Sequence, residues 1–129
     1  MKHRLLLMLF IAIGGALGSL MRYILSGLMQ NLIGYGFPWG TLAVNMIGCF
    51  FMGFIWNFIH NGFLPASLNV LISVGFIGAL TTFSTFGIET VHLFYEGKGL
   101  LALGNIAFSV VCGLLLVYIG ILTGRLFFN

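Results

Sequence analysis

The sequence predicts an all-α integral membrane protein, and its composition and hydropathy pattern support this fold class. The chain has 129 residues, of which 60% are hydrophobic and only 5% are charged. Soluble domains carry about a quarter of their residues as charged side chains, which argues against a soluble fold. The apolar residues form four runs, each close to the length of about 20 residues that a bilayer-crossing helix needs. Because these runs use most of the chain, we expect residues 1–129 to form a single four-helix transmembrane domain.

The first span is expected at about 5–29. It begins after a basic start, as a signal peptide does, but further spans follow, so we interpret it as an uncleaved helix. Gly14 and Gly18 form a small-xxx-small pair that allows close contact between helices. Arg22 lies near the far end of the span. Its side chain either extends to lipid headgroups or provides a cation at a water-filled mouth.

The second span is expected at about 39–60 and carries Asn45. Thr41 and Gly48 lie about one turn to either side of Asn45, which places all three on one helix face. An amide at this depth usually bonds a neighbouring helix. The alternative is that its NH₂ group points into a pore.

The third span, at about 68–95, holds a cluster of hydroxyl side chains close after Gly78. The cluster consists of Thr81, Thr82, Ser84 and Thr85. Hydrocarbon offers such groups no water, so they should face protein or a water-filled path. Glycine weakens the helix here, and we expect the third helix to be broken mid-membrane. The break would free carbonyl groups that can hold a cation.

Phe83 and Phe86 lie three residues apart and therefore share one helix face. Aromatic ring edges carry partial positive charge, so the two rings can contact an anion without binding it tightly. Glu89 follows Phe86 by three residues and is expected to extend the same face. If that face lines a pore, Glu89 would tune access to it or carry protons.

The last span is expected at about 100–127, with Asn105, Ser109 and Gly113 at four-residue spacing. Such a seam more often packs helices than lines a route. Asn105 and Ser109 would nevertheless add hydrogen-bond donors at the depth of the third-span cluster.

The basic residues are dispersed over both expected sides of the membrane. One side has Lys2, Arg4 and Arg125, and the other has Arg22 and Lys98. This bias is too small to fix one orientation, so both orientations are expected and would allow an antiparallel homodimer. Dispersed charges also argue against nucleic-acid binding. No acid, base and nucleophile converge, so an enzyme is not expected.

Three segments of the chain resemble the bacterial Fluc family of fluoride ion channels. They run from Gly14 to Arg22, from Trp39 to Asn45, and from Gly78 to Phe86 with Glu89 following. The similarity in length and span layout covers the whole chain. The resemblance implies a multi-pass protein of the bacterial plasma membrane, an antiparallel, dual-topology homodimer, that lets cytoplasmic fluoride leave through two pores.

The resemblance also implies roles for single residues. Asn45 would donate to fluoride, and Phe83 of one subunit and Phe86 of the other would present ring edges to it. Other members of the implied polar track are Thr82, Ser84, Thr85 and Ser109, with Arg22 and Glu89 at a vestibule. A structural Na⁺ at the dimer centre would be held by the backbone carbonyls of Gly78 and Thr81. The family often has an aromatic hydroxyl where this chain has Asn105, so that role is not transferred.

Two other functions fit parts of the pattern. A small proton-coupled multidrug exporter also has four spans, but it needs a carboxylate at membrane depth, for which only Glu89 is available. A non-transporting assembly subunit would explain the glycine seams. It would leave Asn45 and the hydroxyl cluster without a role.

Overall fold

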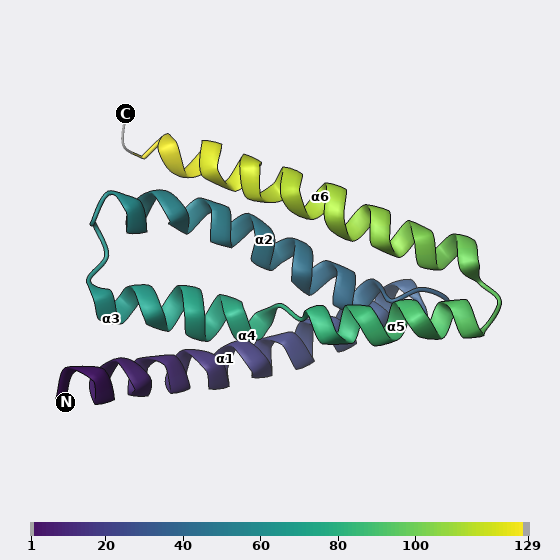
Figure 1. The fold of residues 1–129 in the computed structure, drawn as a ribbon, viewed down its shortest axis with the longest axis horizontal. Helices are drawn as coiled ribbons and strands as arrows, with labels where there is room; N and C mark the ends of the chain where they lie inside the picture. The colour runs from purple at the N-terminus through teal and green to yellow at the C-terminus, as the bar shows by residue number, and fades with distance from the viewer. Residues whose placement is uncertain (1, 128–129) are drawn as a thin grey trace.

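The computed structural model describes residues 2–127, and Figure 1 shows their helices running side by side with both ends of the chain at the same end of the bundle. The elements are α1 (Lys2–Ile33), α2 (Trp39–His60), α3 (Ala66–Asn69), the π-helix η1 (Val70–Ile77), α4 (Gly78–Leu80), α5 (Phe83–Tyr95) and α6 (Gly99–Arg125). Four helical stretches are long and apolar enough to cross a membrane, namely α1, α2, Ala66–Tyr95 and α6. The predicted four spans are therefore confirmed.

The bounds of the first and last spans differ from the expected ones. Helix α1 has 32 residues, and at 1.5 Å per residue it is about 48 Å long, well beyond the hydrocarbon thickness of about 30 Å. Its basic start is helical as well. The sequence did not predict this, because hydropathy identifies only the apolar part of a helix. Helix α6 ends at Arg125, two residues before the expected end.

Helix α1 packs closely on η1 through glycines. A Cβ atom added at Gly14 would overlap the Leu71 carbonyl oxygen, and one added at Gly18 would overlap the Phe76 carbonyl oxygen. From the other side, a Cβ at Gly75 would lie 2.8 Å from the Ile11 carbonyl oxygen. The close contact predicted for Gly14 and Gly18 is confirmed, and it fixes α1 against the first half of the third span.

Helices α2 and α6 form a second close pair. Gly53 lies against the Val117 carbonyl, while Gly120 and Gly124 lie against the carbonyls of Phe50 and Phe54. The same seam contains a buried amide, because Asn57 Nδ2 donates to the Ile121 carbonyl oxygen at 2.8 Å. Gly113, the glycine predicted in the fourth-span seam, also faces Cys49 and Met46 of α2, so its packing role is confirmed and extends to Gly120 and Gly124.

Between α4 and α5 the backbone leaves the helical conformation for two residues (Figure 1). Thr81 has φ −84° and ψ 156°, and Thr82 has φ −151° and ψ 116°. Helix α5 then begins at Phe83, and the Thr82 hydroxyl caps it by accepting from the Thr85 N–H. Threonine at this position favours a helix start, since its hydroxyl satisfies an N–H group that has no partner within the helix.

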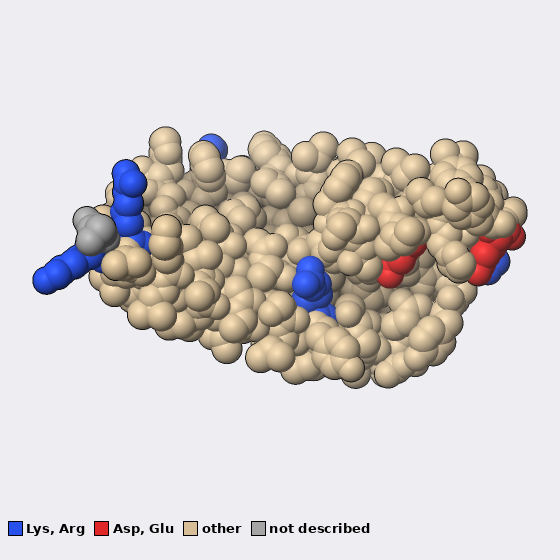
Figure 2. Space-filling view, turned by 60° about the horizontal axis from the view of Figure 1, so that its bottom comes forward, with Lys and Arg blue, Asp and Glu red and all other residues tan. Residues whose placement is uncertain are grey.

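Charged side chains are sparse on the surface. Figure 2 shows basic groups toward one end of the displayed face, a further basic group near its middle, and acidic groups with a basic group beside them toward the other end. The rest of this face carries neither acidic residues nor lysine or arginine, as expected for a protein surrounded by lipid.

Candidate functional site

Asn45 bridges α2 to the two extended residues of the third span. Its Nδ2 donates to the Thr82 carbonyl oxygen at 3.1 Å, and its Oδ1 accepts from the Thr82 N–H at 2.7 Å. The side-chain amide thus supplies both bonds that a helix would have given to Thr82. An asparagine amide has two N–H donors, so one remains beyond the bond to Thr82.

The hydroxyl cluster is linked through Thr82. Thr82 Oγ1 donates to Thr85 Oγ1 at 3.0 Å and lies 3.3 Å from Ser84 Oγ. It also accepts from the Thr85 N–H at 3.2 Å. Since Asn45 fixes the Thr82 backbone, it also fixes the origin of this chain of hydroxyl groups.

A cavity of about 350 Å³ opens beside these residues, between α2, the extended segment and α6. Its lining brings together several of the predicted pore residues, namely Asn45, Thr82, Phe83, Phe86 and Ser109, together with Thr81. The rings of Phe83 and Phe86 have centroids 5.5 Å apart, and Phe83 is 83% exposed. Ser109 lines the cavity, and its Oγ is buried without a hydrogen-bond partner among the described residues.

The other predicted site residues do not line this cavity. Ser84 and Thr85 are linked to the cavity by their hydrogen bonds to Thr82, which lines it. Gly78 lies in α4, where its N–H donates to the Gly75 and Ser73 carbonyls. Arg22 is partly buried on α1, and its Nη1 lies 3.4 Å from the Thr81 carbonyl oxygen.

Glu89 lines a different cavity from Phe86, although both residues lie in α5. This second cavity, of about 360 Å³, is lined by Gln30, Tyr35, Gly36, Phe37, Pro38, Glu89, His92, Leu93 and Glu96. Three residues turn a helix by about 300°, so Glu89 lies only about 60° around α5 from Phe86 and lines the neighbouring cavity.

Arg22 and Glu89, both expected at a vestibule, do not line a common cavity among the described residues. Glu89 lines the second cavity and Arg22 contacts the extended segment beside the first. One carboxylate oxygen of Glu89, Oε2, is buried without a hydrogen-bond partner among the described residues.

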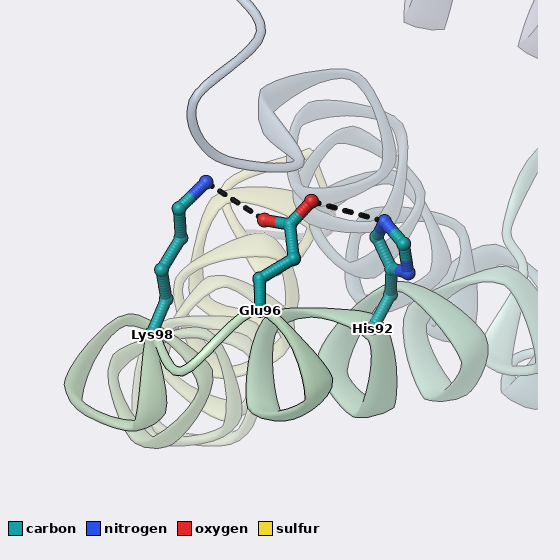
Figure 3. A network of polar contacts seen from close by, with 3 residues as sticks. All are labelled: His92, Glu96 and Lys98. Carbon is teal, nitrogen blue, oxygen red and sulfur yellow. Dashed lines mark hydrogen bonds and ion pairs between the residues drawn. The ribbon is translucent and has the colours of Figure 1, made fainter.

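A polar network at the end of α5 forms part of the second cavity (Figure 3). Glu96 Oε2 accepts from Lys98 Nζ at 2.7 Å, and Glu96 Oε1 lies 3.1 Å from His92 Nε2. The hydrogen bond and charge of Lys98 lower the pKa of the Glu96 carboxyl group. This end of the cavity thus keeps a carboxylate that is partly balanced by a lysine.

Sequence reasoning did not identify the partner of Asn105. The amide is only 2% exposed, and its Nδ2 donates to Thr90 Oγ1 at 2.8 Å, which joins α6 to α5. Two polar residues at matching depth in consecutive spans were the available signal. Thr90 lies beyond the hydroxyl cluster, and a single threonine in an apolar helix does not indicate a partner.

The first cavity can receive a small anion but has no group that would bind one irreversibly. Its polar lining consists of an amide and hydroxyl groups, and its lining contains no lysine, arginine or carboxylate. Ring edges of the two phenylalanines add weak positive potential. Among residues 2–127, no three His, Cys, Asp or Glu side chains cluster as a metal site would require.

These features define a multi-pass helical membrane protein with a neutral, mostly apolar cavity that carries an amide and hydroxyl groups at a discontinuity of its third span. Residues 9–121 match the family described as "CrcB-like protein, Camphor Resistance (CrcB)". The chain belongs to this CrcB-like family, which agrees with the family indicated by the sequence motifs.

Individual relatives are similar over nearly their whole length. The protein named "Fluoride-specific ion channel FluC" from Geobacter sp. (strain M21) is 46% identical over 119 residues, which are 92% of this chain and 96% of the relative. Proteins of the same name from Magnetococcus marinus and Shewanella putrefaciens (strain CN-32) are 44% and 45% identical, covering 91% and 87% of this chain and 96% and 90% of the relatives. The relatives are named as channels and not as enzymes, and this chain is a multi-pass bacterial membrane protein.

Proposed function

We propose that this chain is a fluoride-selective ion channel through which cytoplasmic fluoride leaves the cell passively, which lowers its toxicity. Family membership and relatives named as fluoride-specific channels support the proposal. Hydrogen fluoride that enters from acidic surroundings ionises inside, and the negative-inside potential drives the anion outward. The expected location is the plasma membrane.

The first cavity is the observation that carries the proposal. Fluoride is small and strongly hydrated, so a pore must replace its water with donors and still release it. The second Nδ2 hydrogen of Asn45 and the unpartnered Ser109 hydroxyl are such donors. Thr82, with Ser84 and Thr85 bonded to it, continues the polar track.

The two phenylalanines complete this pathway through a second subunit. Phe83 is largely exposed at the cavity, which supports a second copy covering it. In an antiparallel homodimer of dual topology, Phe83 of one subunit and Phe86 of the other would line each of two pores. The small charge bias between the two sides of the membrane supports insertion in both orientations.

A structural Na⁺ at the dimer centre is part of the proposal. The extended conformation of Thr81 and Thr82 leaves the carbonyl groups at the end of α4 without helical partners, and neutral oxygens of this kind suit a hard monovalent cation. Gly78 and Thr81 would supply these oxygens where the third helix breaks at membrane depth. The ion would hold the interrupted third helices of the two subunits together, because it would be attracted to the carbonyl oxygens of both.

Fluoride efflux from proteoliposomes, followed with a fluoride-selective electrode, tests the function. We expect electrogenic efflux that requires valinomycin and K⁺ as the counter-ion path, and no comparable chloride efflux under the same conditions. Protein-free liposomes measure leakage of hydrogen fluoride. Efflux no faster than in these liposomes, or equal chloride efflux, would reject the proposal.

The proton-coupled exporter is the other function that the sequence left open. It is not favoured, because the relatives are named as fluoride channels and Glu89 lies outside the first cavity. Glu89→Gln separates the two functions. A channel keeps fluoride efflux without a proton gradient, whereas an exporter with this substitution loses proton-driven transport of an organic cation such as ethidium.

A further inference from the structure

Arg22 is a charged side chain within the first span, and its contact lies on the third. Its Nη1 reaches the Thr81 carbonyl oxygen at 3.4 Å, across 59 residues of sequence. Charged side chains at membrane depth are costly unless they pair with one another or with backbone carbonyls. Arg22 pairs with the backbone carbonyl of Thr81, which lies at the discontinuity of the third span.

The Thr81 carbonyl is available because the neighbouring donors are used elsewhere. In a continuous helix it would accept from the Thr85 N–H, but this N–H donates to Thr82 Oγ1. The amide of Asn45 bonds Thr82 and not Thr81. A cation is also the favoured partner at the carboxyl end of a helix, where the helix dipole is negative.

The contact with Arg22 is long. Charge-assisted N–H···O bonds are usually about 2.7–2.9 Å, so a separation of 3.4 Å indicates a weak bond that another cation can displace. Two cations that compete for one carbonyl oxygen at low dielectric repel each other strongly. They would therefore occupy the oxygen alternately.

We infer that Arg22 is a positioning residue that holds the Thr81 carbonyl when sodium is absent and releases it when sodium binds. This inference rests on the sodium site of the proposed function. It gives Arg22 a role at the interruption of the third helix that is separate from attracting anions at a pore mouth. Its prediction is that removing Arg22 strengthens the response of the protein to sodium.

The test measures thermal unfolding of the full-length protein in detergent as NaCl replaces N-methyl-D-glucamine chloride at constant ionic strength. In Arg22→Gln we expect a lower melting temperature without sodium and a larger rise on adding it. The sodium concentration for half of the rise should fall by about threefold or more, because a competitor has been removed. Arg22→Lys keeps a tethered cation and should stay close to the wild type. Arg125→Gln, which removes an exposed arginine at the end of α6, is the matched control.

Each result bears on the inference. If Arg22→Gln lowers the melting temperature equally with and without sodium, Arg22 is only structural and the inference is wrong. The same conclusion follows if Arg125→Gln changes the sodium response as much as Arg22→Gln does. If Arg22→Gln does not fold, Arg22→Lys decides, because a sodium response differing strongly from the wild type contradicts competition by a tethered cation. If no variant responds to sodium, the sodium site fails together with this inference, while fluoride efflux measured separately still tests the channel.

Discussion

Replacing Asn45 with leucine tests the bridge between α2 and the extended segment. The substitution keeps the approximate volume but removes both partners of Thr82, whose N–H and carbonyl are bonded at 2.7 and 3.1 Å. A buried polar group left unsatisfied costs about 1–3 kcal/mol, whereas measured side-chain hydrogen bonds in membranes average about 0.6 kcal/mol. For two groups we expect a loss of about 2 kcal/mol in the free energy of unfolding.

The assay combines reversible unfolding in mixed micelles with fluoride efflux from proteoliposomes. Asn105→Leu is the matched control, because it removes a buried amide with one bond to Thr90 and does not line the first cavity. We expect the Asn45 variant to lose both stability and efflux. The Asn105 variant should lose about 1 kcal/mol of stability while its folded fraction still conducts.

Two results would refute this reasoning. An Asn45→Leu protein as stable as the wild type would show that the two bonds to Thr82 contribute nothing measurable. A destabilised protein that still conducts fluoride at the normal rate per folded molecule would show that Asn45 only holds helices together. The second result would restore the simpler role of an interhelical amide.

Three further predictions follow from the described contacts. Ser109→Ala should change the free energy of unfolding by less than about 0.5 kcal/mol, because the hydroxyl has no partner among residues 2–127, but should slow fluoride efflux; unchanged efflux would remove Ser109 from the pathway. Gly14→Ala should cost about 1–3 kcal/mol of stability in mixed-micelle unfolding, since its Cβ would overlap a backbone carbonyl, whereas Gly15→Ala, with nothing within 4 Å, should cost little; similar losses would contradict the close packing of α1 on η1. Glu96 has a lowered pKa in the folded protein, so its pairing with Lys98 should stabilise the fold above the carboxyl group's unfolded pKa of about 4.3 and lose this effect as pH falls through the lower folded value. The melting-temperature difference between the wild type and Glu96→Gln should shrink over that range, and a difference that grows on acidification would reverse the assigned sign.

The spans and the close helix pairs could be predicted because they depend on local pattern. A run of apolar residues sets a membrane helix without reference to the rest of the chain. Glycines four residues apart, such as Gly14 and Gly18, share a helix face whatever lies opposite. The sequence therefore predicted that these faces pack closely. It did not show that Gly14 meets Leu71 in a π-helix, because that requires the tertiary arrangement.

The candidate site was predictable only in part, for a physical reason that concerns helix continuity. Asn45, Thr82 and Ser109 could be selected because amides and hydroxyls are unusual in lipid, and Phe83 and Phe86 because their rings flank this polar cluster. Their assignment to one cavity depends on where the third helix stops. The position of Glu89 shows the limit, since its place three residues after Phe86 in α5 does not reveal that it lines a separate cavity.

The interruption at Thr81 and Thr82 links the stability of the fold to the proposed pathway. In a continuous helix, the Thr82 backbone groups would be bonded within the helix. The Asn45 side-chain amide would then lose the two hydrogen bonds that now fix its orientation. The Thr82 hydroxyl would likewise have no free N–H at Thr85 to accept from, so it would lose the anchor that now orients it. The donors offered to an ion are therefore oriented by bonds that exist only because the helix stops. Substitutions that extend the helix through this segment would satisfy the backbone better and, for the same reason, dismantle the donor arrangement.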